Sequence, residues 1–385
     1  MSNVEVLDCR GDHHAMGVVQ GEACRETLRS MHRALVEFSG LQPNQLLARV
    51  LRRATLPVAS TVGRAGKRFM ARDFQKSYPE QHERLLGIAE GAAIPIHHLF
   101  VGPAIEIALN RTSYRTPGGC TAIAVAPAKC LSDEAIIAKN FDYPSAALAT
   151  YLARTSHPTG KASSIDITNA PLCGSHEGVN EHGLAIAYNY GSFRGSGQRR
   201  VTITTLVQET LETCRNVEEA VKYLGERPRV GGALLMLADA TGAIASVELA
   251  PDQLGVRQPE PDHPWLVHAN HAVTPEIKSR DVPHNAVFSR WYPRTMRGLV
   301  VQESSLRRHA RATDLLAAAA RVGETELTTM LADHGPGDSP GDDNTICRHG
   351  PYYQTTCSVL LFPKRRAIAV TFGAPCTEEF STITL

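Results

Sequence analysis

The spacing of hydrophobic residues changes about a third of the way along the chain. Before that point, residues 17–37 contain few helix breakers, and the apolar residues from Leu85 to Ala89 gather on one side of a helix. Gly91 and Pro95 then end this second stretch. The pattern predicts a helical N-terminal third.

After the sequence TPGGC, which ends at Cys120, short apolar runs typical of strands predominate. CTAIAVAP and EAIIAKNFDYP predict two strands joined by a polar turn, and GVNEHGLAIAYNY predicts a turn that leads into a strand. ALLMLADATGAIASVELAP and CSVLLFPKRRAIAVTFGAP each predict a hairpin, with turns at Asp239–Gly242 and Pro363–Arg366.

Two further helices are predicted between these strands. In NVEEAVKYLGERP, Asn216 and Glu219 have the spacing of a capping box, and an Ala-rich stretch covers 306–322. Hairpins interspersed with helices predict an α+β fold, in which helices cover antiparallel sheets. We expect one compact unit with a helical N-terminal part wrapped onto it.

Composition narrows the classes of partner. The 385 residues are 43% hydrophobic, and 40 basic against 39 acidic residues argue against nucleic acid or an anionic membrane. We find no apolar run long enough to cross a bilayer and no signal peptide, so we expect a cytoplasmic protein. The nine irregularly spaced cysteines agree with a cytoplasmic location, because they do not suggest a disulfide framework. Without a C-x-x-C pair we expect no structural zinc site.

Cys120 is the leading candidate for a nucleophile. It follows Pro117, Gly118 and Gly119 and would occupy the start of a strand. There its thiol could attack the preceding carbonyl in an N→S acyl shift, and Gly119 hinders that attack little. Hydrolysis would leave Cys120 with a free α-amine, whose ordinary pKa of about 7.7–8.0 suits a base for its own thiol. The alternative is a strand cysteine that packs as a small hydrophobe.

Three other polar segments supply candidate partners. In KNFDYP, Asn140 and Asp142 share one face of a strand, unless this is an edge strand with a solvated face. In HANH, Asn270 could donate an amide N–H to an oxyanion; the alternatives are a zinc site that uses both histidines and a surface loop. In DDNTICRHG, Arg348 could bind a substrate carboxylate or an acid, or form a structural ion pair.

These segments, in this order, resemble one family. GDHHAMGVVQGEACRETL, YPEQHERLLGIAEGA, GGCT, KNFDYP, GVNEHGLAIAYNY, HANH and ICR are similar to segments of the acyl-coenzyme A:6-aminopenicillanic acid acyltransferases, the peptidase C45 group of N-terminal nucleophile hydrolases. The resemblance runs nearly end to end. It departs from the family at Phe141, where the family has tryptophan, and at Lys139, where it has glutamine, which leaves the substrate open.

The resemblance implies an αββα sandwich and a cut between Gly119 and Cys120. The products would be a small helical chain, 1–119, and a large catalytic chain, 120–385, that stay associated. It further implies the role of nucleophile for Cys120, of neighbouring acid for Asp142 and of oxyanion-hole residue for Asn270.

The remaining site residues also follow from the resemblance. It implies a role for Arg348 near the acids and the substrate. It matches Tyr188 and Asn189 to a Tyr-Asn pair of the family, and we assign both to a substrate pocket together with Thr121, Asn140 and Tyr143. The expected activity is cleavage or formation of a linear amide through a thioester acyl-enzyme, by hydrolysis or transfer. The partners are then a small-molecule amide or acyl donor and an amine acceptor. We expect no metal or redox cofactor, although acyl-coenzyme A could donate the acyl group.

Two rival interpretations remain at this stage. The sixteen histidines could serve a metal-dependent hydrolase. The pairs His13–His14 and His97–His98 are poor chelates, however, because adjacent residues do not share a face. Alternatively, the chain could be an inactive family member that acts as a binding or scaffold protein.

Overall fold

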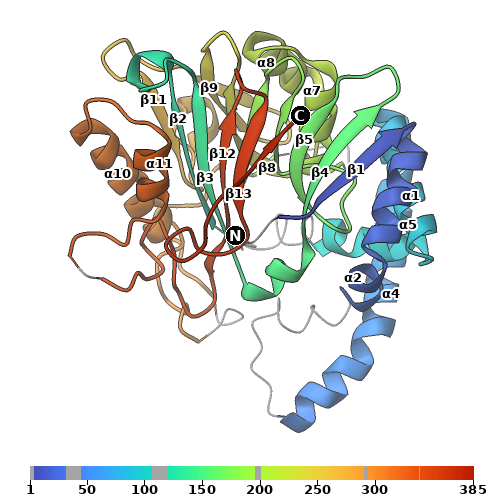
Figure 1. Ribbon diagram of the computed structural model, residues 1–385. Helices are drawn as coiled ribbons and strands as arrows, with labels where there is room; N and C mark the ends of the chain where they lie inside the picture. Colours follow the sequence, from blue (N-terminus) through green and yellow to red (C-terminus); the bar gives the residue numbers. More distant parts are fainter. Residues whose placement is uncertain (1–3, 32–44, 106–118, 196–200, 290–293, 338) are drawn as a thin grey trace.

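Two β-sheets stacked face to face form the middle of the molecule, and helices cover the outer face of each (Figure 1). This arrangement is taken from a computed structural model, which describes residues 4–31, 45–105, 119–195, 201–289, 294–337 and 339–385. Within these residues, no helix is long and apolar enough to cross a membrane.

Within the described residues, the larger sheet has eight strands and includes a strand from the N-terminal part. In spatial order the strands are β1 (Val6–Gly11), β4 (Tyr151–Pro158), β5 (Ser164–Asn169), β6 (Glu177–Asn180), β7 (Ala185–Gly191), β8 (Gly232–Ala238), β9 (Ile244–Leu249) and β10 (Leu254–Arg257). All neighbours are antiparallel except β1 and β4, which are parallel. The N-terminal third is therefore not purely helical, because β1 extends this sheet.

Within the same residues, the smaller sheet has six strands and carries the candidate nucleophile. Its spatial order is β11 (Trp265–His268), β2 (Gly119–Val125), β3 (Ile136–Tyr143), β12 (Gln354–Phe362), β13 (Ala367–Thr371) and β14 (Ser381–Thr384). KNFDYP lies on β3, between β2 and β12, so the edge-strand alternative is wrong. Cys120 pairs with Phe141, and Gly119 with Asp142.

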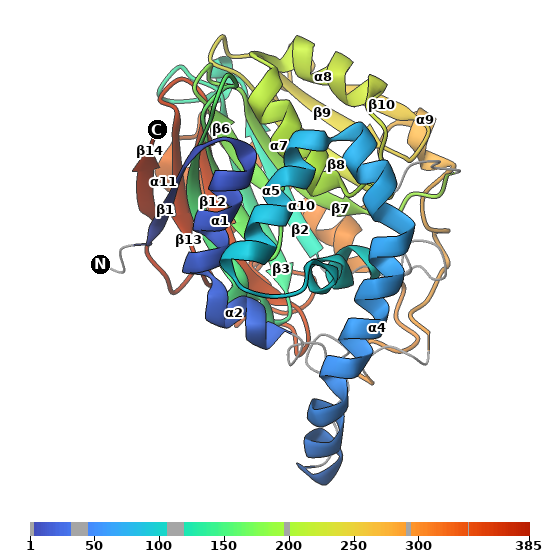
Figure 2. The same cartoon turned by 90° about the vertical axis from the view of Figure 1, so that its right-hand side faces the viewer.

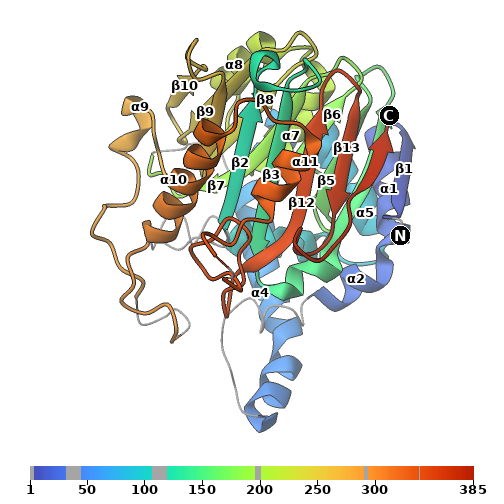
Figure 3. The same ribbon diagram turned by 60° about the vertical axis from the view of Figure 1, so that its left-hand side comes forward.

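Helices form the two outer layers (Figures 2 and 3). Over the larger sheet lie α1 (His13–Ala23), α2 (Arg25–Ser30), α4 (Gln45–Ser77), α5 (Pro79–Gly91), α7 (Ile203–Thr213) and α8 (Val217–Glu226). Over the smaller sheet lie α10 (Glu303–Ala318) and α11 (Glu324–Leu331), and the short α9 (Pro275–Lys278) lies near β10. Short 3₁₀ turns are η2 (Ile96–Phe100), η3 (Pro127–Lys129) and η4 (Ser145–Thr150).

Close contact between α1 and α5 depends on glycine. A Cβ on Gly17 would lie 2.1 Å from the backbone oxygen of Arg84, and one on Gly87 would lie 2.1 Å from that of His14. Each helix therefore carries glycine where the other helix's backbone touches it.

Three separate cores confirm the αββα sandwich. One lies between the two sheets and includes Cys120, Ile137 and Phe141. A second packs the larger sheet against the helices over it, and a third packs the smaller sheet against α10 and α11. The central strands of each sheet are thus buried on both faces, whereas the edge strands β1, β10 and β14 are partly exposed.

Most predicted elements are confirmed, with small differences at their ends. Both hairpins form, as β8–β9 and β12–β13. Asn216 caps α8 by accepting the Glu219 N–H at 2.9 Å, but the Glu219 carboxylate accepts the N–H of Arg215 rather than that of Asn216. The first predicted helix divides at Cys24, and its positions 32–37 lie outside the described residues, as do Pro117 and Gly118.

Candidate active site

Cys120 is the second residue of β2, and its side chain is 1% exposed in the core between the sheets. Burial raises the pKa of the Cys120 thiol to about 11. The thiol is therefore protonated near neutral pH in the uncut chain, and a nearby base is needed to generate the thiolate that attacks.

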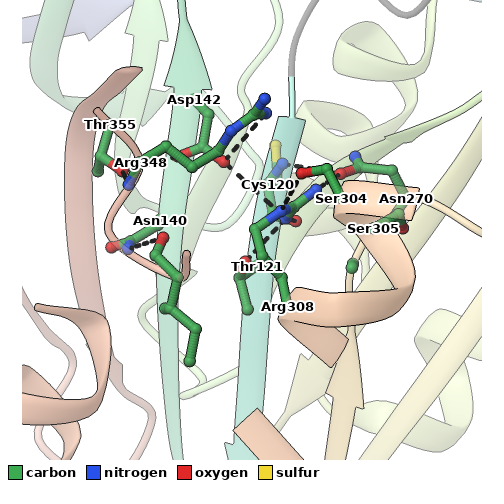
Figure 4. Close-up of polar contacts among 12 residues, drawn as sticks. Cys120, Thr121, Asn140, Asp142, Asn270, Ser304, Ser305, Arg308, Arg348 and Thr355 are labelled. Carbon is green, nitrogen blue, oxygen red and sulfur yellow. Dashed lines mark hydrogen bonds and ion pairs between the residues drawn. The ribbon is translucent and has the colours of Figure 1, made fainter. Parts of the chain in front are cut away.

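Asn270 holds the backbone of Cys120 (Figure 4). Its Oδ1 accepts the Cys120 N–H at 2.9 Å and an Nη2 hydrogen of Arg308 at 2.9 Å, while its Nδ2 donates to the Tyr190 carbonyl at 3.0 Å. These partners fix the orientation of the amide. Asn270 follows β11, which pairs with β2, and it is only 9% exposed, so the surface-loop interpretation of HANH is wrong.

Arg308 on α10 is a site residue that sequence reasoning missed. The Nη1 of Arg308 donates to the Cys120 carbonyl and also to Thr121 Oγ1, the latter at 2.8 Å. Burial and the charge of Arg348 lower the pKa of Arg308 to about 10, so it remains charged near neutral pH. The sequence signal is its place on the buried stripe that runs from Ser305 to Leu316, where a cation is unexpected.

Asp142 lies opposite Gly119 and carries an unsatisfied acceptor. Its Oδ1 accepts the Thr355 hydroxyl at 2.9 Å, whereas its buried Oδ2 has no hydrogen-bond partner. That oxygen lies 3.8 Å from Arg348 Nη1 and 3.9 Å from Arg308 Nη1. A buried carboxylate between two cations is electrostatically compensated, but its Oδ2 can still accept a hydrogen bond.

Arg348 closes the site above Gly119. Its Nη2 donates to Asp343 Oδ1 at 2.9 Å, and its guanidinium lies 5.0 Å from the Tyr353 ring. A Cβ on Gly119 would lie 2.3 Å from Arg348 Nη1 and 3.2 Å from Asp142 Oδ2. Arg348 thus pairs with Asp343, lies near Asp142 and leaves room only for glycine before Cys120, while its role toward a substrate stays a prediction.

Two residues of the predicted substrate pocket lie on the helix side of β2 and β3. Thr121 accepts a hydrogen bond from Arg308. Asn140 donates to the carbonyls of Leu331 and Ile346, at 2.8 and 3.0 Å, and accepts from Ser358. These contacts tie β3 to the segments around α11. A role in substrate binding stays a prediction for both residues.

The other three predicted pocket residues are spread over both faces of the larger sheet and the end of β3. Tyr143 stacks on Phe141 at 4.6 Å, and Asn189 donates to the Ala269 carbonyl at 3.0 Å, beside Asn270. Tyr188 belongs to the core on the helix side of its sheet. Of the three, Asn189 has the most direct link to Asn270, and all three roles stay predictions.

A buried ion pair between Lys139 and Glu177 lies beside Cys120 in the layer between the sheets. The Lys139 ammonium also lies 4.4 Å from the centre of the Phe141 ring, and its charge partly offsets the effect of burial on the Cys120 pKa. Sequence reasoning noted Lys139 only as a departure from the family. Its position on the same strand face as Phe141 could have identified it as buried.

The histidines of HANH do not form a zinc site. His268 contacts Ser246 at 2.6 Å, and His271 contacts Ser305 at 2.7 Å. Among the described residues, the groups of potential metal ligands contain neither histidine. Burial lowers the pKa of His271 to about 3, so it remains neutral.

Comparisons with known proteins give one family and several distant structures. The N-acylethanolamine-hydrolyzing acid amidase ortholog of Caenorhabditis elegans is 14% identical, with a TM-score of 0.44, covering 64% of this chain and 93% of that one. A mutant conjugated bile acid hydrolase of Clostridium perfringens is 13% identical, with a TM-score of 0.41, covering 69% and 97%. Penicillin V acylase of Agrobacterium tumefaciens is 15% identical, with a TM-score of 0.39, covering 66% and 83%.

No curated protein sequence matches the chain. The family match covers residues 130–372, well over half of the chain, and begins at Cys130, so that Cys120 and the rest of β2 lie before it. The matched region nevertheless contains β3, the HANH segment and the Arg348 loop, which contact Cys120 or Gly119. The chain belongs to the acyl-coenzyme A:6-aminopenicillanic acid acyl-transferase family.

Proposed function

We propose that the chain cuts itself between Gly119 and Cys120 and then makes or breaks linear amide bonds through a thioester on Cys120. The observation that carries the proposal is the acceptor on the Cys120 nitrogen, together with the carboxylate beside Gly119. Asn270 Oδ1 already accepts the single hydrogen of the Cys120 nitrogen, and Asp142 Oδ2, which has no hydrogen-bond partner, lies beside Gly119. A free amine at this position has additional hydrogens for which such acceptors are available.

Self-cleavage begins with attack of the Cys120 sulfur on the Gly119 carbonyl carbon. The peptide C–N bond breaks, its nitrogen takes up a proton and becomes the α-amine, and a thioester joins Gly119 to the sulfur. Water then attacks the thioester, which releases the Gly119 carboxylate and the free thiol. The close approach of Arg348 to Gly119 favours this step, because a cation stabilises the oxyanion that develops there.

Turnover uses the same sulfur with the new amine as its base. The α-amine takes the thiol proton as the thiolate attacks the substrate carbonyl, and it returns a proton to the leaving amine. Asn270 uses one Nδ2 hydrogen on Tyr190, and its second is the proposed donor to the substrate oxyanion. Arg308 holds Asn270 and the Cys120 carbonyl in register.

The acyl-enzyme then reacts either with water or with an amine. Water gives a carboxylic acid, and an amine gives a new amide, so hydrolysis and transfer share one intermediate. The family description includes an acyl-coenzyme A substrate, which makes an acyl thioester a candidate donor here.

The test is direct detection of the acyl-enzyme. The protein is mixed with chromogenic anilides of several acyl chains or with acyl-coenzyme A. The reaction is quenched in acid, and the protein and its peptides are analysed by mass spectrometry. We expect an acyl adduct on a peptide that contains Cys120, removable by hydroxylamine and absent in Cys120→Ala. Adding an amine separates transfer from hydrolysis. Turnover with no adduct and full activity of Cys120→Ala would contradict the proposal.

A matched control keeps the test specific to the nucleophile. Cys130 is also a buried cysteine of the smaller sheet's core, but it lies on the helix side and contacts Ser132. Cys130→Ala should keep the adduct and the turnover. If both variants lose activity together, loss of folding rather than of the nucleophile explains the result, and circular dichroism of each variant distinguishes the two.

A further inference from the structure

Four potential metal ligands converge beside the loop that carries Arg348. They are His334, which follows α11; Cys347 and His349, which flank Arg348; and Cys376, which follows β13. Three segments that are distant in sequence thus bring two sulfurs and two imidazoles together. One ligand atom from each residue lies within 4.8 Å of the other three.

The spacing of the ligand atoms fits a tetrahedral ion. The two sulfurs are 3.7 Å apart, the two Nε2 atoms 3.1 Å, and each sulfur lies 3.4 Å from His349 Nε2. A tetrahedral zinc with ordinary bond lengths separates two sulfurs by roughly 3.8 Å, two nitrogens by about 3.3 Å and a mixed pair by about 3.6 Å. These four separations are therefore close to those that one shared ion requires, and the His334 ligand atom lies within 4.8 Å of both sulfurs.

The backbone fixes the ligands in this arrangement. The Cys347 N–H donates to the Asp333 carbonyl at 3.0 Å, and the His349 N–H donates to the Asp342 carbonyl at 3.2 Å. These two bonds hold the C-x-H pair against the end of α11 and the preceding turn. Preorganised ligands reduce the ordering cost of binding an ion.

A glycine allows the loop to close on the two imidazoles. Gly341 has a φ of +82°, and a Cβ on it would lie 2.8 Å from His349 Cδ2 and 3.1 Å from His334 Cδ2. Any side chain at this position would displace both rings. The tight approach thus preserves the geometry of the four ligands.

We propose that His334, Cys347, His349 and Cys376 bind one structural zinc ion. Two thiolates and two neutral imidazoles form a complete tetrahedral set that is typical of structural zinc and leaves no position for substrate. Our sequence-based expectation of no such site rested on the missing C-x-x-C pair. Here the ligands are a C-x-H pair and two residues from other segments, which that spacing rule does not cover.

The ion would position Arg348, which is the residue between two of its ligands. The Arg348 guanidinium reaches the active site, where its Nη1 lies 3.8 Å from Asp142 Oδ2, and its backbone N–H donates to the Thr355 hydroxyl oxygen at 2.8 Å. Joining the loop to α11 and to the segment after β13 restrains that guanidinium. Loss of the ion is therefore expected to slow self-cleavage as well as to lower thermal stability.

A disulfide is the competing explanation for the paired sulfurs. The 3.7 Å between Cys347 and Cys376 far exceeds the roughly 2.05 Å of an S–S bond, and both cysteines are free. A disulfide would also leave the two converging histidines without a role. Thiol titration of the denatured protein distinguishes a reduced pair from an oxidised one.

The test is the metal content of protein produced without a polyhistidine tag. After dialysis, we expect about one zinc per chain by inductively coupled plasma mass spectrometry, lost in Cys376→Ser and in His334→Ala. Matched controls remove the same residue types elsewhere. Cys24 lies between α1 and α2, far in the fold from the proposed ligands, and His263 is exposed, so Cys24→Ser and His263→Ala should both keep the zinc.

A second measurement keeps the proposal testable if the ligand variants fail to fold. Wild-type protein is stripped with a chelator and titrated with Co²⁺, which should give the visible bands of a tetrahedral ion and thiolate charge transfer. Protein that holds no zinc and shows no such spectrum would overturn the proposal. So would an unchanged zinc content in both ligand variants, or a Cys347–Cys376 disulfide. Zinc content is measured independently of self-cleavage, so neither result decides the other.

Discussion

Asn270 Oδ1 accepts the backbone N–H of Cys120 at 2.9 Å, which places an acceptor on the atom that self-cleavage would turn into the α-amine. The same oxygen also accepts from Arg308. The amine would thus be held from the moment it forms, with no movement of the strand. Sequence reasoning assigned Asn270 only to the oxyanion, so its contact with Cys120 adds a second role.

Replacing Asn270 should therefore affect both steps. Asn270→Ala leaves the Cys120 N–H and an Arg308 hydrogen without an acceptor, and it also removes the proposed oxyanion donor. We expect slower self-cleavage and a loss of roughly 10²–10³ in kcat. Asn216→Ala is the control, because it removes the cap of α8 at a cost of about 1 kcal/mol without touching the site. Equal activity of the two variants would contradict the role.

Gly119→Ala tests the space before the nucleophile. Its Cβ would meet Arg348 Nη1 at 2.3 Å, so the guanidinium must move away from Gly119. We expect self-cleavage to slow by at least tenfold, measured as the fraction of uncut chain on a denaturing gel over time. Gly102→Ala is a matched control, because nothing lies within 4 Å of its Cβ. Cleavage at the normal rate in Gly119→Ala would exclude the proposed function of this contact.

Asp142→Asn separates charge from shape. It keeps the hydrogen bond from Thr355 but removes the negative charge beside Gly119. Losing that charge destabilises a protonated α-amine and so lowers its pKa, which moves the rising limb of kcat/KM to lower pH. Misorientation of the base should also lower kcat/KM by about 10². A pH–rate profile identical to that of the wild type would remove Asp142 from the site, and thermal unfolding checks that the variant folds.

Most of the fold follows from residue patterns. Alternating and continuous apolar runs predict β2, β3 and both hairpins. These strands are buried, and the apolar side chains that bury them are visible in the local sequence. The missed strand, β1, has few apolar residues and is half exposed at the sheet's edge, where it pairs in parallel with β4. Its formation depends on a distant partner, which local patterns do not contain.

The candidate site is less completely predictable than the fold. Three residues stand out in the sequence. Cys120 directly follows two glycines at the start of a strand, Asp142 is a polar residue on an apolar strand, and Asn270 follows an apolar strand. Arg308 is one of several arginines on a helix, and only the buried stripe that it shares with Ser305 distinguishes it. Of the four proposed zinc ligands, only Cys347 and His349 are close in sequence, and tertiary structure alone brings His334 and Cys376 to them.

Acid should destabilise the fold through buried neutral histidines. Burial lowers the pKa of His176 and of His271 from 6.5 to about 3, and that of His309 to about 4. Between these values and 6.5 the unfolded chain binds more protons than the folded one, so stability falls as the pH drops below about 6.5. Urea unfolding from pH 7.5 to pH 4.5 should show a steady fall in midpoint. A flat profile would mean that these rings are hydrated.

Intact mass under denaturing conditions tests the central claim most directly. For freshly purified wild-type protein, we expect two species, residues 1–119 and 120–385, with the larger one beginning at Cys120. Cys120→Ala should give one uncut species, and mixing it with processed enzyme should not cut it, because the attack is intramolecular. A single uncut wild-type species that turns over amides at full rate would contradict self-cleavage as the source of the catalytic base.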